Sequence, residues 1–263
     1  MSAQFPLVGC FWLSCWIMWN RSLLRVCAAG FGVAMLAGCG SPSSKITSTA
    51  GGSRTPSLTD TVASHSATSA SPAQLKKIVL VSADFPVAWK GTPHQGAPND
   101  AAWRAFFVKC LAVRNTDSDK VSEANSQDFA RGDAVVVSNA TSYRSQSDID
   151  TDVAAIHGPK FSPCVDQLMK KQSAQSQPPG TPITASFKIT SGSAGGPANV
   201  VGTGTGTVKS RVDGQQVVLY LSVSYITGPL IEAEVDTSNI GAPVPASEVK
   251  SLVAAVATRA ARG

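Results

Sequence analysis

The chain has 263 residues, of which 43% are hydrophobic, and carries 22 lysine and arginine residues against 17 aspartate and glutamate residues. This length and apolar content are sufficient for one domain with a buried core. The formal net charge is +5, and the sequence contains no basic cluster interleaved with aromatic residues. This argues against a nucleic-acid-binding protein. A modest positive charge is compatible with a position beside a membrane surface.

Two apolar stretches open the chain, 5–19 and 26–38, separated by a short segment with two arginines. Each is shorter than the roughly 20 apolar residues that a membrane-spanning helix needs. The second stretch has the order of a secretory signal peptide, with positive charge, then an apolar segment, then small residues at a cleavage site. We therefore predict a signal peptide region over 1–38, with Met18 as the natural start. The alternative is a short buried hairpin of helices.

The second apolar stretch ends on Leu36-Ala37-Gly38-Cys39. This motif resembles the lipobox of bacterial lipoproteins. The resemblance implies that Cys39 is the first mature residue and carries a thioether-linked diacylglyceryl anchor, with palmitate as a typical acyl chain. It also implies a location at the outer face of the plasma membrane, in the cell envelope.

Cleavage before Cys39 leaves that residue, Cys110 and Cys164 as the cysteines of the mature chain. Because an exported protein meets oxidising conditions, we predict a Cys110–Cys164 disulfide. Two free buried thiols are the alternative. The chain-entropy model credits such a loop with roughly 4 kcal/mol of stabilisation, before native strain is subtracted. No cysteine or histidine spacing indicates zinc or redox chemistry, so no metal or cofactor is predicted.

Residues 39–74 are rich in serine, threonine, alanine and glycine, with three prolines and almost no large apolar side chains. Such a segment cannot bury enough surface to offset its ordering entropy. We predict a flexible tether over 39–74 that joins the lipid to a single globular domain over 75–263.

The first half of the domain predicts two strands and three helices. The strands cover 78–81 and 133–143. One helix begins at Asn99 or Asp100, a second begins at Ser147, and a third carries Cys164.

The last third predicts antiparallel strands followed by a helix. Apolar residues alternate from Ile183 to Ile189, a strand rich in glycine and threonine covers 200–212, and Asp213-Gly214 indicates a hairpin turn. Further strands follow, and a helix begins near Pro245. The predicted fold class is α+β, an antiparallel sheet with helices packed on one face and one disulfide.

Three motifs invite a chemical interpretation. The run from Gly202 to Gly206 lacks the Gly-Lys-Ser/Thr ending of a phosphate-binding loop, so close packing against a helix explains it better. Asp148, Asp150 and Asp152 lack the glycine and glutamate of a calcium loop and instead suit the first turns of a helix. Ser247-x-x-Lys250 matches a Ser-x-x-Lys pattern, but the partner motifs of penicillin-binding enzymes are absent.

Trp89 and Trp103 flank a polar loop that contains His94. Core packing explains two tryptophans adequately. The functional interpretation is the entrance of an apolar cleft, because ligand pockets are commonly lined by aromatic side chains. We therefore take Trp89, Trp103 and His94 as candidate ligand-binding residues.

The lipobox, the motif Asp84-Phe85-Pro86-x-x-Trp89 and the segment from Gly132 to Cys164 resemble actinobacterial lipoproteins of uncharacterised function. The later part of that segment is similar to the extracytoplasmic sensor domains of mycobacterial-type serine/threonine kinases. This similarity extends over 78–260. Those sensors carry two disulfides, whereas this chain has cysteines for one.

These observations predict a lipid-anchored, non-enzymatic binding or sensing protein of the cell envelope. Its expected partners are the membrane, through Cys39, and an apolar or cell-wall-derived ligand or an envelope protein. One alternative is an envelope hydrolase with a dispersed site around His94 or Ser247. The other is a structural protein that docks through an exposed edge strand at 200–212.

Overall fold

The fold is taken from a computed structural model, which describes residues 69–94, 100–175, 177–192, 197–212 and 215–263. The signal peptide region, the lipobox with Cys39, and nearly all of the tether lie outside the described residues.

The described residues form five α-helices, two short 3-10 helices and eight strands. The helices are α2 (Pro72–Leu75), α3 (Asp100–Leu111), α4 (Gln146–His157), α5 (Phe161–Gln175) and α6 (Ala246–Ala260), and the 3-10 turns are η1 (Ser82–Asp84) and η2 (Asp117–Asp119). The strands are β1 (Lys90–Thr92), β2 (Lys120–Asn125), β3 (Asp128–Arg131), β4 (Ala134–Tyr143), β5 (Thr184–Ser191), β6 (Val200–Val212), β7 (Gln215–Gly228) and β8 (Ile231–Ile240).

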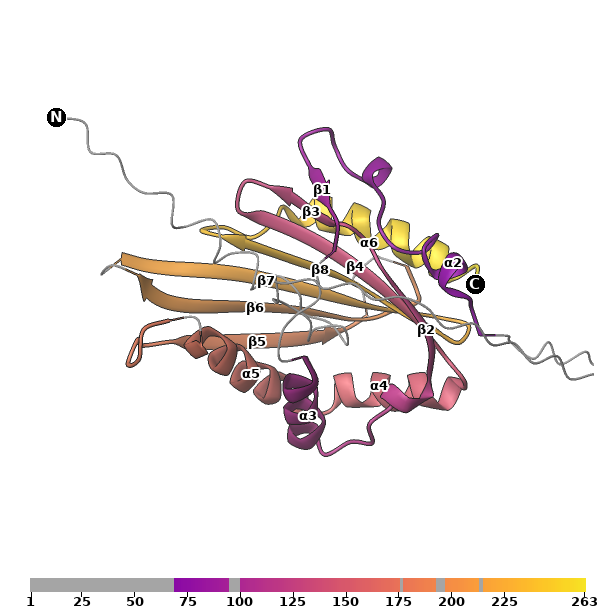
Figure 1. The fold of residues 1–263 in the computed structure, drawn as a ribbon, viewed down its shortest axis with the longest axis horizontal. Coiled ribbons are helices and arrows are strands. Elements are labelled where there is room, and N and C mark those ends of the chain that lie inside the picture. Colours follow the sequence, from indigo (N-terminus) through magenta and orange to yellow (C-terminus); the bar gives the residue numbers. More distant parts are fainter. Residues whose placement is uncertain (1–68, 95–99, 176, 193–196, 213–214) are drawn as a thin grey trace, which may run out of the picture. The chain divides into compact units, whose positions relative to one another are not determined.

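The strands make one antiparallel sheet in the order β1-β3-β4-β8-β7-β6-β5, and β2 also pairs with β4 (Figure 1). The α+β class and the antiparallel sheet are therefore confirmed. β6 lies between β5 and β7, so the expected edge strand at 200–212 is wrong. The edge of the sheet on this side is β5, which pairs with β6 alone.

Helices cover both faces of the sheet, which corrects the expectation of one covered face. On one face, α6 packs its Leu252 and Val256 against alternate residues of β8, including Ala233 and Val235. On the other face, α5 packs against β5 and β7 through a cluster formed by Phe161, Val165, Met169, Phe187 and Val223. Each face of the sheet is therefore apolar where a helix packs on it and polar elsewhere. The alternation within one strand does not show which parts of a face a helix covers.

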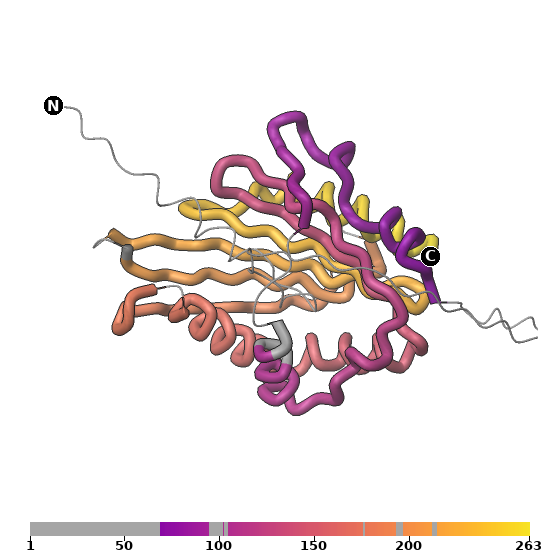
Figure 2. Tube along the Cα trace, viewed as in Figure 1, coloured from indigo at the N-terminus to yellow at the C-terminus, as the bar shows by residue number. Residues whose placement is uncertain are grey.

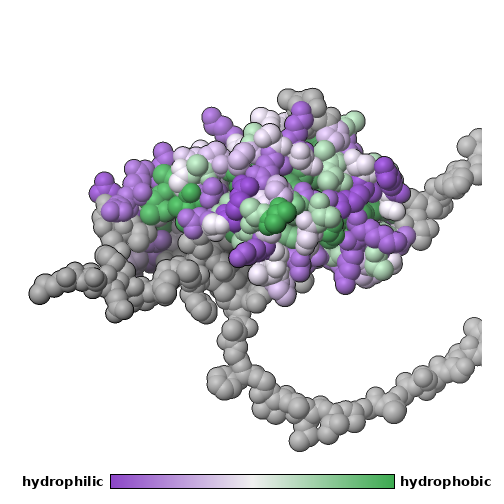
Figure 3. All heavy atoms as spheres, turned by 90° about the horizontal axis from the view of Figure 1, so that it is seen from above, coloured by the Kyte–Doolittle hydropathy of each residue, from purple (hydrophilic) through white to green (hydrophobic). Residues whose placement is uncertain are grey.

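The segment before β1 lies beside α6, as the chain trace shows (Figure 2). The predicted strand over 78–81 is wrong, because these residues form turns and extended backbone without a strand partner. Ile78, Val79 and Leu80 are nevertheless buried in the cluster under α6. The Leu80 N–H donates to the Ser138 hydroxyl at 2.8 Å instead of to a neighbouring backbone carbonyl. Seen from above, this side of the molecule presents mainly hydrophilic side chains with hydrophobic patches between them (Figure 3).

Candidate functional site

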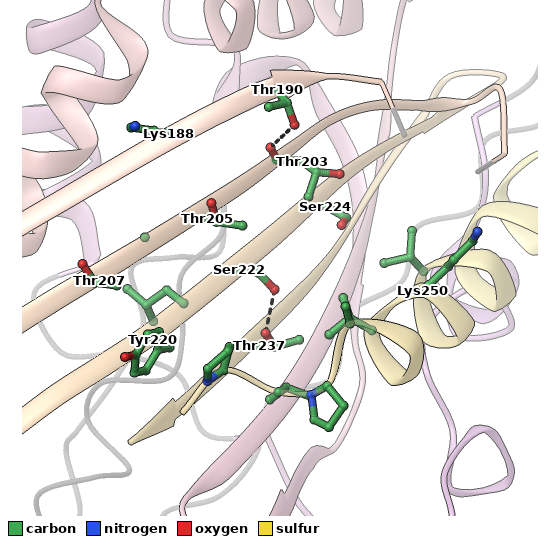
Figure 4. A pocket seen from close by; sticks show the side chains of 18 of the residues that line it. Lys188, Thr190, Thr203, Thr205, Thr207, Tyr220, Ser222, Ser224, Thr237 and Lys250 are labelled. Atoms are coloured by element: carbon green, nitrogen blue, oxygen red, sulfur yellow. Dashed lines mark hydrogen bonds between the residues drawn. The ribbon is translucent and has the colours of Figure 1, made fainter. Parts of the chain in front are cut away.

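A cleft of about 770 Å³ lies between the sheet and the beginning of α6. We call it the hydroxyl cleft, because threonine and serine side chains of four neighbouring strands form its floor (Figure 4). The floor consists of Ser186, Lys188, Thr190, Thr203, Thr205, Thr207, Tyr220, Ser222, Ser224 and Thr237.

The register of the strands organises the floor into rows that run across the sheet. Lys188 of β5, Thr205 of β6, Ser222 of β7 and Thr237 of β8 are successive cross-strand partners. Rows on either side of this one begin at Thr190 and at Ser186. Cross-strand partners share one face of a sheet and neighbouring strands are about 4.8 Å apart. The rows therefore present a grid of hydroxyls.

The alternating sequence of β6 explains why this face is open while the other is packed. Glycines at 202, 204 and 206 point to the face under α5, and the threonines between them point to the cleft. A Cβ built at Gly204 would lie 2.1 Å from Cζ of Phe187, and one at Gly206 would lie 3.3 Å from Cε of Met169. The glycines therefore let the Phe187 ring lie directly on β6. The expectation of close packing against a helix holds in part, because Ile156 of α4 and Met169 of α5 approach Gly202 and Gly206, whereas the group on Gly204 is the Phe187 ring of β5.

The second wall of the cleft is apolar. It consists of Pro243, Val244, Pro245, Ala246, Val249 and Val253, from the β8–α6 connection and the first turns of α6. The helix is held in place by Glu248, which accepts from Trp89 Nε1 at 2.7 Å and pairs with Arg131 at 2.8 Å. Arg259, near the other end of α6, pairs with Asp84 at 2.8 Å. The wall is thus fixed to the segment that precedes β1.

The charged side chains that line the cleft are both positive. Lys188 comes from β5 and Lys250 from α6, and no aspartate or glutamate is among the described residues that line the cleft. Neither lysine forms an ion pair with the described residues. The cleft also lies at the beginning of α6, where the helix dipole adds partial positive charge. The electrostatics of the cleft therefore favour an anionic ligand.

Some of the cleft hydroxyls already have partners. Thr190 donates to the carbonyl of Thr203 at 3.1 Å, and the hydroxyls of Ser222 and Thr237 lie 2.7 Å apart. In the described part of the chain, the hydroxyls of Thr205 and Ser224 make no hydrogen bond, although Ser224 is only 3% exposed. A hydroxyl that lines a cleft and has no protein partner provides hydrogen-bonding capacity for a ligand.

A row of carboxyl groups lies on the opposite face of the sheet. Glu232, Glu234 and Asp236 alternate along β8 and are 8%, 5% and 6% exposed. The alternation of β8 indicates a solvated outward face for Glu232 and Glu234, and the structure shows that this is wrong. Burial raises the pKa of Asp236 well above its ordinary value. Both of its carboxyl oxygens lack a hydrogen-bond partner among the described residues.

Two of the three predicted ligand-binding residues, Trp89 and His94, can be placed relative to the hydroxyl cleft. Trp89 is 7% exposed, and the Arg131 guanidinium lies 4.4 Å from the centre of its ring. His94 Nδ1 lies 2.7 Å from Asp128 Oδ1. Trp103 belongs to α3, but its side chain is outside the described part. Neither Trp89 nor His94 lines the hydroxyl cleft, and a ligand role for these three residues stays a prediction.

The three aspartates of the calcium-like motif lie in α4, which begins after Ser145 and not at Ser147 as expected. Asp148 accepts from the Ser145 hydroxyl at 2.8 Å and pairs with Arg114. These contacts lower the pKa of Asp148, the Ser145 hydrogen bond most. Thr116 donates to Asp152 at 3.1 Å. Asp148 and Asp152 therefore fasten α4 to the chain before β2.

Lys250 of the Ser-x-x-Lys motif lines the hydroxyl cleft, whereas Ser247 does not. No cluster of three or more histidine, cysteine or acidic residues among the described residues could hold a metal ion. Within the same residues, no helix combines the length and the apolar character that crossing a membrane requires.

The predicted disulfide is present. Cys110 at the end of α3 is bonded to Cys164 in α5, with Cα atoms 5.8 Å apart. It joins two helices on the face opposite the hydroxyl cleft, where Phe107 of α3 also packs edge-on against Phe161 of α5.

No protein-family model and no curated protein matches the sequence. Among solved structures, the chain is similar to the extracellular domain of PknH from Mycobacterium tuberculosis. That match has a TM-score of 0.42 and 7% sequence identity, and covers 75% of this chain and 100% of the other.

The hydroxyl cleft is not among the sites that the sequence predicts. Its signal was the spacing of Thr203, Thr205 and Thr207, which alternation places on one face of a strand. The matching serines and the lysine come from strands whose register is set by tertiary pairing. The grid therefore becomes visible only once the strands are aligned.

Proposed function

We propose that this protein is a non-enzymatic binding module of the cell envelope, and that its ligand occupies the hydroxyl cleft. The proposal rests on the cleft itself, which has aligned hydroxyls on its floor, an apolar wall and two lysines that form no ion pair with a described residue. Ligand sites combine a concave, partly apolar surface with a few convergent polar groups in this way.

The disulfide and the lipobox-like motif support an extracytoplasmic location. Disulfides persist in oxidising compartments, and Cys110–Cys164 joins two helices of the folded domain. A lipid on Cys39 would hold the domain at the outer face of the plasma membrane through the tether over 39–74. We also propose that the protein comes from an actinobacterium and that Cys39 carries the lipid.

The chemistry of the cleft supports binding more than catalysis. Its described lining contains hydroxyls and two lysines but no histidine, cysteine or carboxylate. A serine or threonine hydroxyl is a weak nucleophile unless a general base within hydrogen-bond reach activates it. The arrangement is therefore suited to holding a ligand by hydrogen bonds and charge.

Native mass spectrometry of the full-length chain, purified from the envelope of its host, tests this function. We expect a bound mass that is released on denaturation. Replacement of Thr203, Thr205 and Thr207 by valine keeps the shape of the floor and removes its hydroxyls, so the bound mass should disappear. A matched triple variant at the exposed Thr92, Thr184 and Thr258 should retain it. Wild-type protein without a bound mass, or a floor variant that keeps it, would contradict the proposal.

A further inference from the structure

We infer that the ligand of the hydroxyl cleft is a cyclic polyol that carries negative charge, such as a phosphorylated sugar or an inositol phosphate headgroup. This inference rests on the proposed function and specifies the chemical class of its ligand. Three features of the cleft support it independently: its charge, its hydroxyl floor and its apolar wall.

The charge of the cleft selects an anion. Lys188 of β5 and Lys250 of α6 lie at opposite sides of the cleft (Figure 4), so positive charge is present on both sides of it. The described residues of the lining include no carboxylate that would repel an anion. The first turn of α6 lies beside the cleft, and its N-cap, Pro245, offers no side-chain cap. The helix dipole therefore adds partial positive charge there.

The floor selects a ligand with several hydroxyl groups. Hydroxyl side chains donate and accept, so they match a polyol, which also does both. The hydroxyls of Thr205 and Ser224 have no hydrogen-bond partner in the described structure, and both residues line the cleft. A ligand hydroxyl that enters the cleft can therefore bond either of them.

The apolar wall selects a ring over an open chain. Pro243, Pro245 and Val249 line the cleft beside the hydroxyl floor, and Tyr220 contributes an aromatic ring. A cyclic polyol has polar edges and a face of C–H groups, so it can satisfy both walls at once. A fully apolar ligand would leave the floor hydroxyls unpaired, which disfavours it.

The test uses the full-length chain labelled at threonine methyl groups, titrated in separate experiments with myo-inositol 1-phosphate and with uncharged myo-inositol. Methyl resonances of Thr203, Thr205 and Thr207 report binding at the floor. A third titration uses dihexanoyl-phosphatidylinositol below its micellar concentration, with dihexanoyl-phosphatidylcholine as its control. This pair separates a lipid headgroup from a free polyol phosphate as the source of the same chemistry.

The matched variants remove positive charge and leave the threonine and serine hydroxyls of the floor in place. Lys188→Gln combined with Lys250→Gln removes both cations of the cleft. Lys90→Gln combined with Lys160→Gln removes two exposed lysines outside it. We expect the cleft pair to weaken binding of myo-inositol 1-phosphate about tenfold or more, because charged hydrogen bonds are the stronger ones. The control pair should leave binding unchanged.

The inference is supported if the floor resonances shift more with myo-inositol 1-phosphate than with myo-inositol. This preference should disappear in the Lys188→Gln, Lys250→Gln double variant. Tighter binding of the phosphatidylinositol than of the free phosphate would identify a lipid headgroup, and the reverse a free polyol phosphate. Equal binding of charged and uncharged inositol would overturn the anionic class while leaving the proposed function intact. If no probe shifts the floor resonances, the inference is wrong, and native mass spectrometry decides the proposed function separately.

Discussion

At the scale of single residues, β6 alternates glycine with threonine from Gly202 to Thr207, and the two residue types face opposite sides of the sheet. The sequence run correctly predicted close packing on the glycine side, because a strand glycine often marks the approach of another element. It could not show that the approaching group is the Phe187 ring. That depends on the pairing of β5 with β6.

Gly204→Ala tests the packed side of this strand. The new methyl group would lie 2.1 Å from Cζ of Phe187, so the ring must shift within a filled cluster. Overpacking of this kind costs about 1–3 kcal/mol. Urea unfolding should show that loss for Gly204→Ala, whereas Thr205→Ala on the exposed cleft side should change the unfolding free energy by about 0.5 kcal/mol or less. Equal stability of the two variants would contradict the assigned faces.

The buried carboxyl group of Asp236 should make the unfolding free energy depend on pH. Because burial raises its pKa, the folded state keeps a proton that the unfolded chain has lost above about pH 4. The contribution of this group to the unfolding free energy therefore falls as pH rises. Asp236→Asn removes the titration and retains the side-chain shape, so it should unfold at a higher temperature than wild type at pH 7.

The gap between Asp236→Asn and wild type should shrink as the pH of the melting experiment falls toward about 4. Asp133→Asn replaces an exposed carboxyl and provides the control. A variant that is less stable than wild type at neutral pH would show that the Asp236 carboxylate is stabilised in the fold.

At the scale of elements, the long periodic segments were predicted well and the short ones were not. The helix with Cys110, the helix with Cys164, the strand ending at Tyr143 and the helix after Pro245 all occur as expected. The short strands β2 and β3 were not predicted, and the apolar run at 78–81 is not a strand. A run of four apolar residues fits several buried conformations, and only its tertiary partners select one.

The disulfide is the covalent link between two of these elements. Cys110 and Cys164 close a loop with a sequence separation of 54 residues and join α3 to α5. Replacing both with serine should lower the unfolding free energy by about 2–4 kcal/mol, mainly because the unfolded chain regains freedom. Denaturant unfolding with and without reductant measures this. Wild type should respond to reductant and the double variant should not, and a wild type indifferent to reductant would contradict a stabilising role.

At the scale of the whole molecule, the sequence indicated one antiparallel sheet but placed the helices on one face only. The error arose because each strand was considered alone. α6 covers one face over β7 and β8, and α5 covers the other face over β5. The hydroxyl floor lies on the same face as α6, so the side of that helix forms one wall of the cleft. The cleft forms because α6 covers only part of this face of the sheet and leaves the hydroxyl floor beside it open.

The proposed attachment to the membrane is also a property of the whole molecule. If Cys39 is the lipidated residue, metabolic labelling with a palmitate analogue should mark the wild-type chain and Ser41→Ala, and the label should be lost in Cys39→Ser. The unlabelled variant should leave the membrane fraction. Label that persists in Cys39→Ser would place the lipid elsewhere or reject the lipoprotein assignment.

We expect this protein to bind its ligand at the hydroxyl cleft. Hydrogen–deuterium exchange of the full-length chain, with and without an extract of the host envelope, measures which elements a ligand protects. We predict slower exchange in β5, an edge strand, and in the first turns of α6, while α3, α4 and α5 on the other face stay unchanged. Protection confined to α3, α4 and α5, or no change anywhere, would contradict the claim.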